Sequence, residues 1–298
     1  MSLKKQGFWL VIATAVISGF SIFMNSFAVK GFDSSVFTFS KNLVVALFLI
    51  ALILGFGYRN ELWSLKKKQW LQLLIIGFVG GSVPFLLFFK GLQLTTGSTS
   101  AFIHKTLFLL VIVLATVFLK EKLTKSMIAA SLLLMAGTYF MVKPNFSFSY
   151  GHLLVAGAVI FWAIENTYAK YVLKEVSGTV VAFGRMFFGS LFILIFLAVS
   201  GKLSLVASMS QAQYLWILVT SVFLLLYVLT FYNGLKHIQV STATAVLTIG
   251  APITTLLTWI FRGTTVSSFE AFGILCIGAG TVLILLPHFL SWGYRSEA

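Results

Sequence analysis

Residues 8–29 read FWLVIATAVISGFSIFMNSFAV, a stretch that contains no charged side chain. An apolar helix needs about 20 residues to cross the hydrocarbon core of a membrane, so this stretch alone predicts a membrane-spanning helix. Nine further segments are comparably long and apolar: 35–56, 71–91, 98–119, 126–142, 152–173, 179–199, 212–234, 241–261 and 269–290. We therefore expect an all-α integral membrane protein with ten transmembrane helices.

The composition of the whole chain supports a lipid environment. Of the 298 residues, 59% are hydrophobic and 9% are charged, a balance that would leave a soluble domain with too much apolar surface. Lys and Arg number 21 against 7 Asp and Glu, but these cations lie mostly in short loops between apolar segments. That distribution indicates membrane topology, so we expect the lipid bilayer as a partner and no nucleic acid.

The positive charges also predict the orientation of the chain. With the N-terminus in the cytoplasm, the inner loops hold more cations than the outer loops, which favours cytoplasmic N- and C-termini in the inner (cytoplasmic) membrane of a cell. Inside would lie Lys4, Lys5, Arg59, Lys66, Lys67, Lys68, Lys120, Lys122, Lys125, Lys174, Lys236 and Arg295, and outside Lys30, Lys90, Lys143, Lys202 and Arg262. The bias comes mainly from residues 1–125.

The two halves of the chain resemble each other. GFWLVIATAV (7–16) aligns with GHLLVAGAVI (151–160), and Lys41 then falls on Arg185; after one lost residue, Gly91-Leu92 aligns with Gly234-Leu235 and Ser98-Thr99 with Ser241-Thr242. Apolar helices can align by chance, but shared polar pairs and a matched cation are harder to obtain that way. The sequence therefore predicts two five-helix repeats, residues 1–145 and 146–298.

Five is an odd number of spans, so the second repeat must enter the membrane in the opposite orientation. Inverted-topology repeats are typical of secondary transporters, in which two pseudo-symmetric halves expose a site near the membrane midplane alternately to either side. The repeat thus favours transport by alternating access over membrane-embedded catalysis.

A lysine stands two helical turns inside the fourth predicted span. Lys105 aligns in the repeat with Thr248, a neutral residue, so symmetry alone does not demand a charge there. An ionisable side chain at this depth is costly and indicates a functional site. Lys105 could act as a proton-linked switch, bind a substrate carboxylate, or form a static ion pair; we place Lys105, Thr248 and the neighbouring His104 in the predicted substrate site.

The deepest acid lies near the middle of the sixth predicted span. Trp162, Glu165, Asn166 and Ala169 share one helical face by their spacing. A buried carboxylate beside an aromatic ring can hold a substrate amine, or bind and release a proton. Glu165 could instead form a structural salt bridge with Lys105, and a zwitterionic substrate could open such a pair. We therefore add Trp162, Glu165 and Asn166 to the predicted substrate site.

Four other residues are predicted to have gating or structural roles. Lys41 and Arg185 are repeat partners near the starts of spans two and seven, where a long side chain can reach the interface or contact carbonyls across a gate. Pro84 and Pro252 lie inside spans three and nine, where proline removes a backbone donor and bends a helix.

Several segments together resemble the EamA-type transporters of the drug/metabolite transporter (DMT) superfamily. They are FLKEKLT (118–124), SLLLMAGTYFMV (131–142) and GLKHIQVSTATAVLTIGAP (234–252), and the resemblance covers nearly the whole chain. Glu121 and Lys122 match an acid and a base of the family's segment before the fifth span, whereas Thr264 replaces that acid in the second half.

The resemblance implies a secondary active transporter that exports amino acids or similar small metabolites. No nucleotide-binding loop occurs, which argues against an ATP-driven pump. Uptake or exchange of a cationic or phosphorylated metabolite is an alternative, because Glu165 favours an amine whereas Lys41, Lys105 and Arg185 favour an anion. A membrane-embedded enzyme is the alternative from another class, but the acids are dispersed. We expect no catalytic residue, metal or cofactor, with protons as a candidate coupling ion and a monomer or homodimer.

Overall fold

The computed structural model describes residues 2–28, 31–94, 97–144, 149–263 and 265–293, and these ranges contain helices, turns and loops without any strand. The elements in chain order are α1 (Leu3–Ala28), α2 (Ser34–Gly55), α3 (Arg59–Ser64), α4 (Lys67–Gly81), α5 (Val83–Gln93), α6 (Gly97–Lys105), α7 (Leu107–Phe118), α8 (Lys125–Val142), α9 (Tyr150–Val172), α10 (Gly178–Val199), α11 (Leu203–Ala207), α12 (Gln211–His237), α13 (Val240–Val246), the 3-10 helix η1 (Leu247–Ile249), α14 (Gly250–Arg262) and α15 (Ser268–Gly293).

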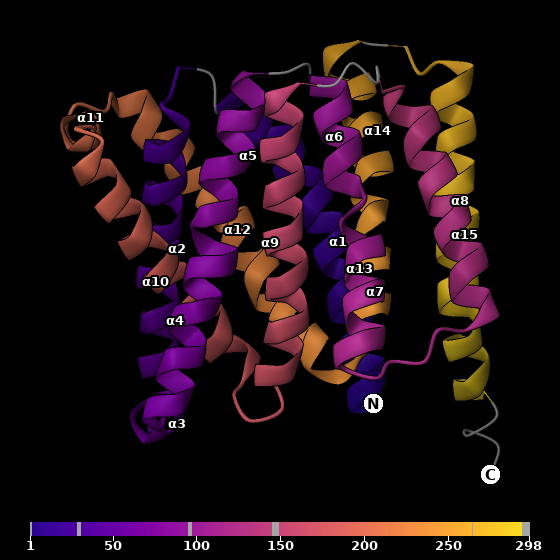
Figure 1. The fold of residues 1–298 in the computed structure, drawn as a ribbon, viewed down its shortest axis with the longest axis horizontal. Coiled ribbons are helices and arrows are strands. Elements are labelled where there is room, and N and C mark those ends of the chain that lie inside the picture. Colours follow the sequence, from indigo (N-terminus) through magenta and orange to yellow (C-terminus); the bar gives the residue numbers. More distant parts are fainter. Residues whose placement is uncertain (1, 29–30, 95–96, 145–148, 264, 294–298) are drawn as a thin grey trace.

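The expected all-α membrane protein is confirmed. Within the described ranges, nine segments are long and apolar enough to cross a membrane. Helix α9 is not among them because polar residues such as His152, Glu165 and Asn166 interrupt its apolar sequence. Its 23 residues nevertheless run the height of the bundle beside the others (Figure 1). Figure 1 also shows that α1 begins and α15 ends on the same side of the bundle.

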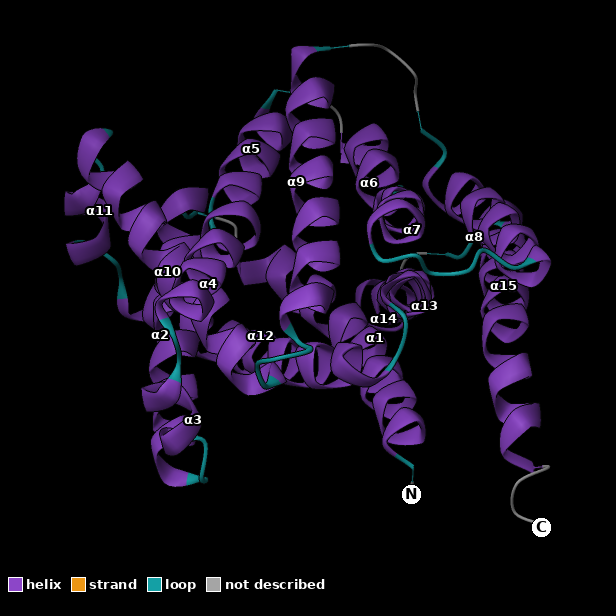
Figure 2. Ribbon diagram, turned by 60° about the horizontal axis from the view of Figure 1, so that its bottom comes forward, coloured by secondary structure: helices purple, strands orange, loops and turns teal. Residues whose placement is uncertain are grey.

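Six of the spanning elements form two rows of three, and Figure 2 shows α5, α9 and α6 of the first row above α12, α1 and α14 of the second. In the first row, α9 packs between α4–α5 and α6–α7; in the second, α1 packs between α12 and α13–α14. Helices α2 and α10 pack on each other and on α4 and α12 at one end of the rows. Helices α8 and α15 form a closely packed pair at the other end. The space between the two rows therefore lies at the centre of the molecule.

Three of the spans are interrupted helices. The third breaks at Ser82, the fourth at Thr106 and the ninth at η1. The sequence predicted bends near Pro84 and Pro252 but no interruption in the fourth span. There, the amide of Thr106 donates to Ile103 O at 3.0 Å and its hydroxyl to the same oxygen at 2.7 Å, so the chain makes a tighter turn than an α-helix.

Packing inside the bundle combines buried apolar side chains with close approaches at small residues. Lipid tails are as apolar as leucine, so membrane helices associate through close packing and hydrogen bonds. Large apolar side chains such as Leu132 and Leu275 point outward, about 70% exposed. Inside, α1 and α12 approach at Gly7 and Gly234, and α5 and α9 approach at Gly91 and Gly151, where an added methyl group would overlap the facing backbone.

These two glycine contacts are equivalent under the repeat alignment. Gly7 aligns with Gly151 and Gly91 aligns with Gly234, so one contact becomes the other when the two halves are exchanged. The two rows are exchanged by the same alignment. The second row (α12, α1 and α13–α14) consists of the eighth, first and ninth spans, which correspond to the third, sixth and fourth spans of the first row (α4–α5, α9 and α6–α7).

Candidate functional site

Glu165 lies in the C-terminal half of α9 and joins the two rows. Its side chain is buried, with 1% exposure. The hydroxyl of Tyr232 on α12 donates a hydrogen bond to Glu165 Oε1 at 2.5 Å. Because α9 and α12 belong to different rows, this bond connects the rows, within two helical turns of the C-terminal ends of both helices.

A glycine whose carbonyl lacks a helical donor packs against the same acid. Pro84 has no N–H, so the carbonyl of Gly80, four residues earlier, has no helical donor. Its oxygen instead accepts hydrogen bonds from Trp162 Nε1 at 3.2 Å and from Arg185 Nη2 at 3.2 Å. The adjacent carbonyl of Gly81 accepts from Asn42 Nδ2 at 3.0 Å. The break in the third span is therefore held by side chains of α2, α9 and α10.

Arg185 belongs to this centre. Its side chain is 7% exposed and its guanidinium lies 5.9 Å from the ring centre of Phe85. The guanidinium interacts electrostatically with Glu165 and Tyr232, while its buried Nε has no hydrogen-bond partner. We call Glu165, Tyr232, Arg185 and Gly80 the acid–arginine cluster.

Aromatic rings surround Trp162 on the neighbouring helices. Its ring centre lies 5.3 Å from that of Phe85, 5.5 Å from that of Phe88 and 5.2 Å from that of His104. His104 also lies 5.2 Å from Phe88. These four rings, here called the aromatic cluster, come from α5, α6 and α9. The structure thus brings predicted site residues His104 and Trp162 into direct contact.

Lys105 stands at the interruption of the fourth span. It is the last residue of α6, is partly buried, and has no hydrogen bond or ion pair to any described protein group. Its repeat partner Thr248 lies in η1 and donates its hydroxyl to Ala245 O at 2.7 Å. Both interruptions therefore fall at the same place in the two repeats. Lys105 and Glu165, whose pairing the sequence left open, are not joined in this conformation.

The remaining predicted residues have local partners. Asn166 donates to Trp162 O at 2.7 Å. Lys41 donates to Asn25 Oδ1 at 2.8 Å and lies 4.8 Å from the ring centre of Phe37. Lys41 and Arg185 are repeat partners, yet Lys41 contacts the first span and Arg185 the third. The hydrogen bonds of the two residues therefore differ, although Arg185 also faces Glu165 on the sixth span.

Polar contacts join the rows on the side where α1 begins. Glu121 accepts hydrogen bonds from the amides of Val240 and Ser241, at 2.8 and 3.2 Å, and from the Ser241 hydroxyl at 2.5 Å. Lys170 on α9 donates to Leu235 O at 2.7 Å and to Lys236 O at 3.2 Å. The Glu121 carboxylate thus lies at the N-terminus of α13, and the Lys170 ammonium lies at the C-terminus of α12. Both placements are favoured by the helix dipoles. We call these contacts the hairpin seal.

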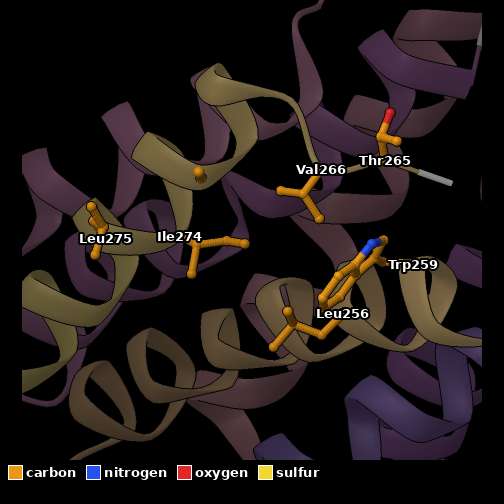
Figure 3. Close-up of a pocket in the computed structure, with 7 residues that line it drawn as sticks. Leu256, Trp259, Thr265, Val266, Ile274 and Leu275 are labelled. Atoms are coloured by element: carbon orange, nitrogen blue, oxygen red, sulfur yellow. The ribbon is translucent and has the colours of Figure 1, made fainter.

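An apolar cavity lies away from these residues. It has a volume of about 610 Å³ and opens between α14 and α15, lined by Leu256, Trp259, Val266 and Ile274 among others (Figure 3). Its lining contains no residue of the predicted site. Among the described residues, no three His, Cys, Asp or Glu side chains gather as a metal site would require.

Sequence reasoning missed the roles of Tyr232 and Gly80. The signal for Gly80 is its position four residues before Pro84, which marks a carbonyl without a helical donor. Tyr232 gave no comparable signal, because its partner lies on a helix 67 positions away. Thr264, which replaces the family's acid in the second half, lies outside the described residues.

Known proteins resemble this chain over most of its length. The model of the EamA-like transporter family matches residues 5–143 and again residues 149–286. The uncharacterized transporter YxxF of Bacillus subtilis (strain 168) is 24% identical over 292 residues, 93% of this chain and 88% of its own. An uncharacterized transporter of Archaeoglobus fulgidus is 24% identical over 206 residues, 67% of this chain and 72% of its own. A crystal structure with 18% identity covers 96% of this chain and 99% of its own with a TM-score of 0.78, which shows a shared fold.

Proposed function

This chain belongs to the EamA-like transporter family, and we propose that it is a secondary active transporter that exports amino acids or similar small metabolites by alternating access. That it is a multi-pass membrane transporter follows from the family and its spanning helices. Export and the amino-acid class rest on the resemblance to EamA-type transporters. Helix α9 is the sixth of ten spans, and residues 1–145 and 146–298 are the two inverted repeats.

The packing of the rows supports alternating access. On the side where α1 begins, α7 of the first row packs against α13 of the second row. The hairpin seal adds hydrogen bonds between the rows on that side. On the opposite side, α5 and α6 pack chiefly on α9, and α14 packs chiefly on α1. The rows are thus tied together on one side, and release of the hairpin seal opens that side. With both termini in the cytoplasm of the inner membrane, the sealed side is the cytoplasmic one.

The substrate site lies between the rows, at the interruptions of the fourth and ninth spans. Discontinuous helices near the midplane supply substrate sites in many transporters. The observation that carries this proposal is Lys105, a cation at a helix interruption with no anionic partner among the described residues. Lys105 and Thr248 flank the site from the two rows, and His104, Trp162, Asn166 and Glu165 complete its wall along α6 and α9.

The remaining candidates serve the movement of the helices. Pro84 and Arg185 hold the kink of the third span through Gly80, Pro252 follows the interruption of the ninth, and Lys41 fixes the second span to the first. Protons are the candidate coupling ion, with Glu165 as their acceptor, and the transporter works as a monomer or homodimer.

Counterflow in proteoliposomes tests this function. The protein is reconstituted, the vesicles are loaded with unlabelled amino acids, and uptake of a labelled amino-acid mixture is followed with and without a pH gradient. Native protein is expected to exchange amino acids saturably, Lys105→Met and Glu165→Gln to lose exchange, and Lys174→Met, which removes an exposed loop cation, to retain it. Exchange that survives both site substitutions would reject the site, and no exchange by the native protein would reject amino acids as substrates.

A further inference from the structure

Four Lys, Arg, Asp or Glu side chains lie deep in the described spanning helices, and three of them have partners within the protein. Lys41 donates to the amide oxygen of Asn25 and lies against the ring of Phe37. Glu165 accepts from Tyr232 and faces Arg185, and Arg185 donates to Gly80 O. Of these four, Lys105 is therefore the one without a polar protein partner among the described residues.

The partners of Glu165 make it a poor receptor for a substrate amine. One carboxylate oxygen already accepts the Tyr232 hydroxyl at 2.5 Å, and the positive charge of Arg185 is close by. An amine would have to displace the hydroxyl and approach a second cation in a low-dielectric interior, where like charges repel strongly. The negative charge of Glu165 is thus offset by the protein itself.

Lys105 is partly buried at the junction between α6 and α7. Beyond this junction, Phe108, Ile112 and Ala115 lie along one face of α7 by their helical spacing. All three are buried, and α7 packs there against α9 and α13. Lys105 thus stands at the interruption of the fourth span in the first row, and Thr248 stands at the equivalent interruption in the second row.

From these charges we infer that the substrate carries a net negative charge and that its carboxylate binds Lys105. Removing an unpaired charge from water is costly, and a bound anion offsets that cost. With Glu165 and Arg185 compensating each other, one negative charge on the substrate leaves the centre neutral. Acidic amino acids and small organic monoanions fit this charge, whereas zwitterions leave an excess cation and amines add another. This inference rests on the proposed function and specifies its substrate class.

Matched compounds that differ in charge test the inference. Counterflow of labelled glutamate is compared with that of glutamine, and counterflow of N-acetylleucine with that of leucine and leucinamide. In native protein the anionic member of at least one series is expected to exchange with roughly tenfold or greater kcat/KM than its neutral or cationic relatives, as loss of one charge-assisted hydrogen bond implies.

Substitutions then assign the preference to Lys105. Lys105→Met is expected to lose the preference for the anion, Lys105→Arg to keep it, and Lys174→Met to behave as native. Because a substitution can impair folding, ligand-induced thermal stabilisation in detergent is measured as well; the anion should raise the Tm of the native protein and not that of Lys105→Met.

The outcomes separate the two proposals. If the native protein exchanges leucine, glutamine or leucinamide faster than the anions, the inference is overturned while transport of amino-acid-like metabolites stands. An anion preference that survives in Lys105→Met overturns the role of Lys105. Absence of exchange with every compound rejects the proposed function and the inference together.

Discussion

The guanidinium of Arg185 donates a hydrogen bond to the carbonyl oxygen of Gly80 at 3.2 Å. This contact exists because Pro84 offers no amide hydrogen to that oxygen. The same guanidinium carries the charge that faces Glu165. One side chain thus supports both the kink of the third span and the buried acid of the sixth.

Removing the cation should destabilise the protein by way of Glu165. Arg185→Met leaves a buried carboxylate without compensation, which costs about 3 to 5 kcal/mol when one partner of a buried ion pair is removed. Arg185 and Glu165 interact electrostatically without a direct contact, so we expect a loss of stability near the lower end of that range. The measurement is thermal unfolding in detergent.

A second substitution distinguishes charge from packing. In Arg185→Met combined with Glu165→Gln, the uncompensated charge is gone, so most of the lost thermal stability should return. If the double variant is as unstable as Arg185→Met, the packing of the arginine against Phe85 is what matters.

Restoring the amide at the kink should slow transport. In Pro84→Ala, the new N–H competes with Trp162 and Arg185 for Gly80 O, and the third span can straighten. We expect a lower Vmax with a KM close to that of the native protein, measured in proteoliposomes. An unchanged Vmax would show that the kink is static.

Gly80 should not tolerate a side chain. A methyl group there would overlap the side chain of Glu165, so Gly80→Ala should displace the acid and abolish transport. Gly278 in α15 has open space around the same position, which makes Gly278→Ala a matched control with near-native transport. Equal activity of the two variants would contradict the structure.

The helical type of the spanning elements could be predicted because membrane length and apolar sequence decide it locally. The interruption of the fourth span could not, since neither Lys105 nor Thr106 is a helix breaker in isolation. The proximity of Arg185 to Glu165 depends on how α10 packs on α4, where Gly81 and Gly189 touch. Such contacts join distant segments, and spacing along the chain carries no record of them.

The hairpin seal should control access from the side where α1 begins. Glu121→Ala removes three accepted hydrogen bonds at the N-terminus of α13, a loss of about 1 to 2 kcal/mol for a cap. In a Cys276→Ser background, Thr244→Cys on buried α13 should then react faster with a membrane-impermeant maleimide added to that side. Glu121→Gln should be intermediate, and Glu175→Gln, an exposed carboxylate nearby, should leave the rate unchanged. Equal rates in all variants would reject the seal as a gate.

On the opposite side, Asp33 links the start of α2 to Lys202. Its Oδ1 accepts from the amides of Ser35 and Val36, at 2.9 and 3.3 Å, and its Oδ2 accepts from Lys202 Nζ at 2.6 Å. Burial opposes ionisation, but the Lys202 bond and the two amides outweigh it and hold the pKa of the Asp33 carboxyl below its ordinary value of 3.8.

The lowered pKa of Asp33 predicts a pH-dependent contribution to stability. A carboxyl group with a lower pKa in the folded state stabilises the protein fully above its unfolded pKa, and this contribution is lost as the pH falls through the folded pKa. The Tm of Asp33→Ala should therefore lie below that of the native protein at pH 7 and pH 5, and the gap should narrow below pH 3.8. Asp33→Asn, which retains a capping oxygen, should lose less. A gap that stays constant from pH 7 to pH 3 would show that the link to Lys202 contributes nothing through its charge.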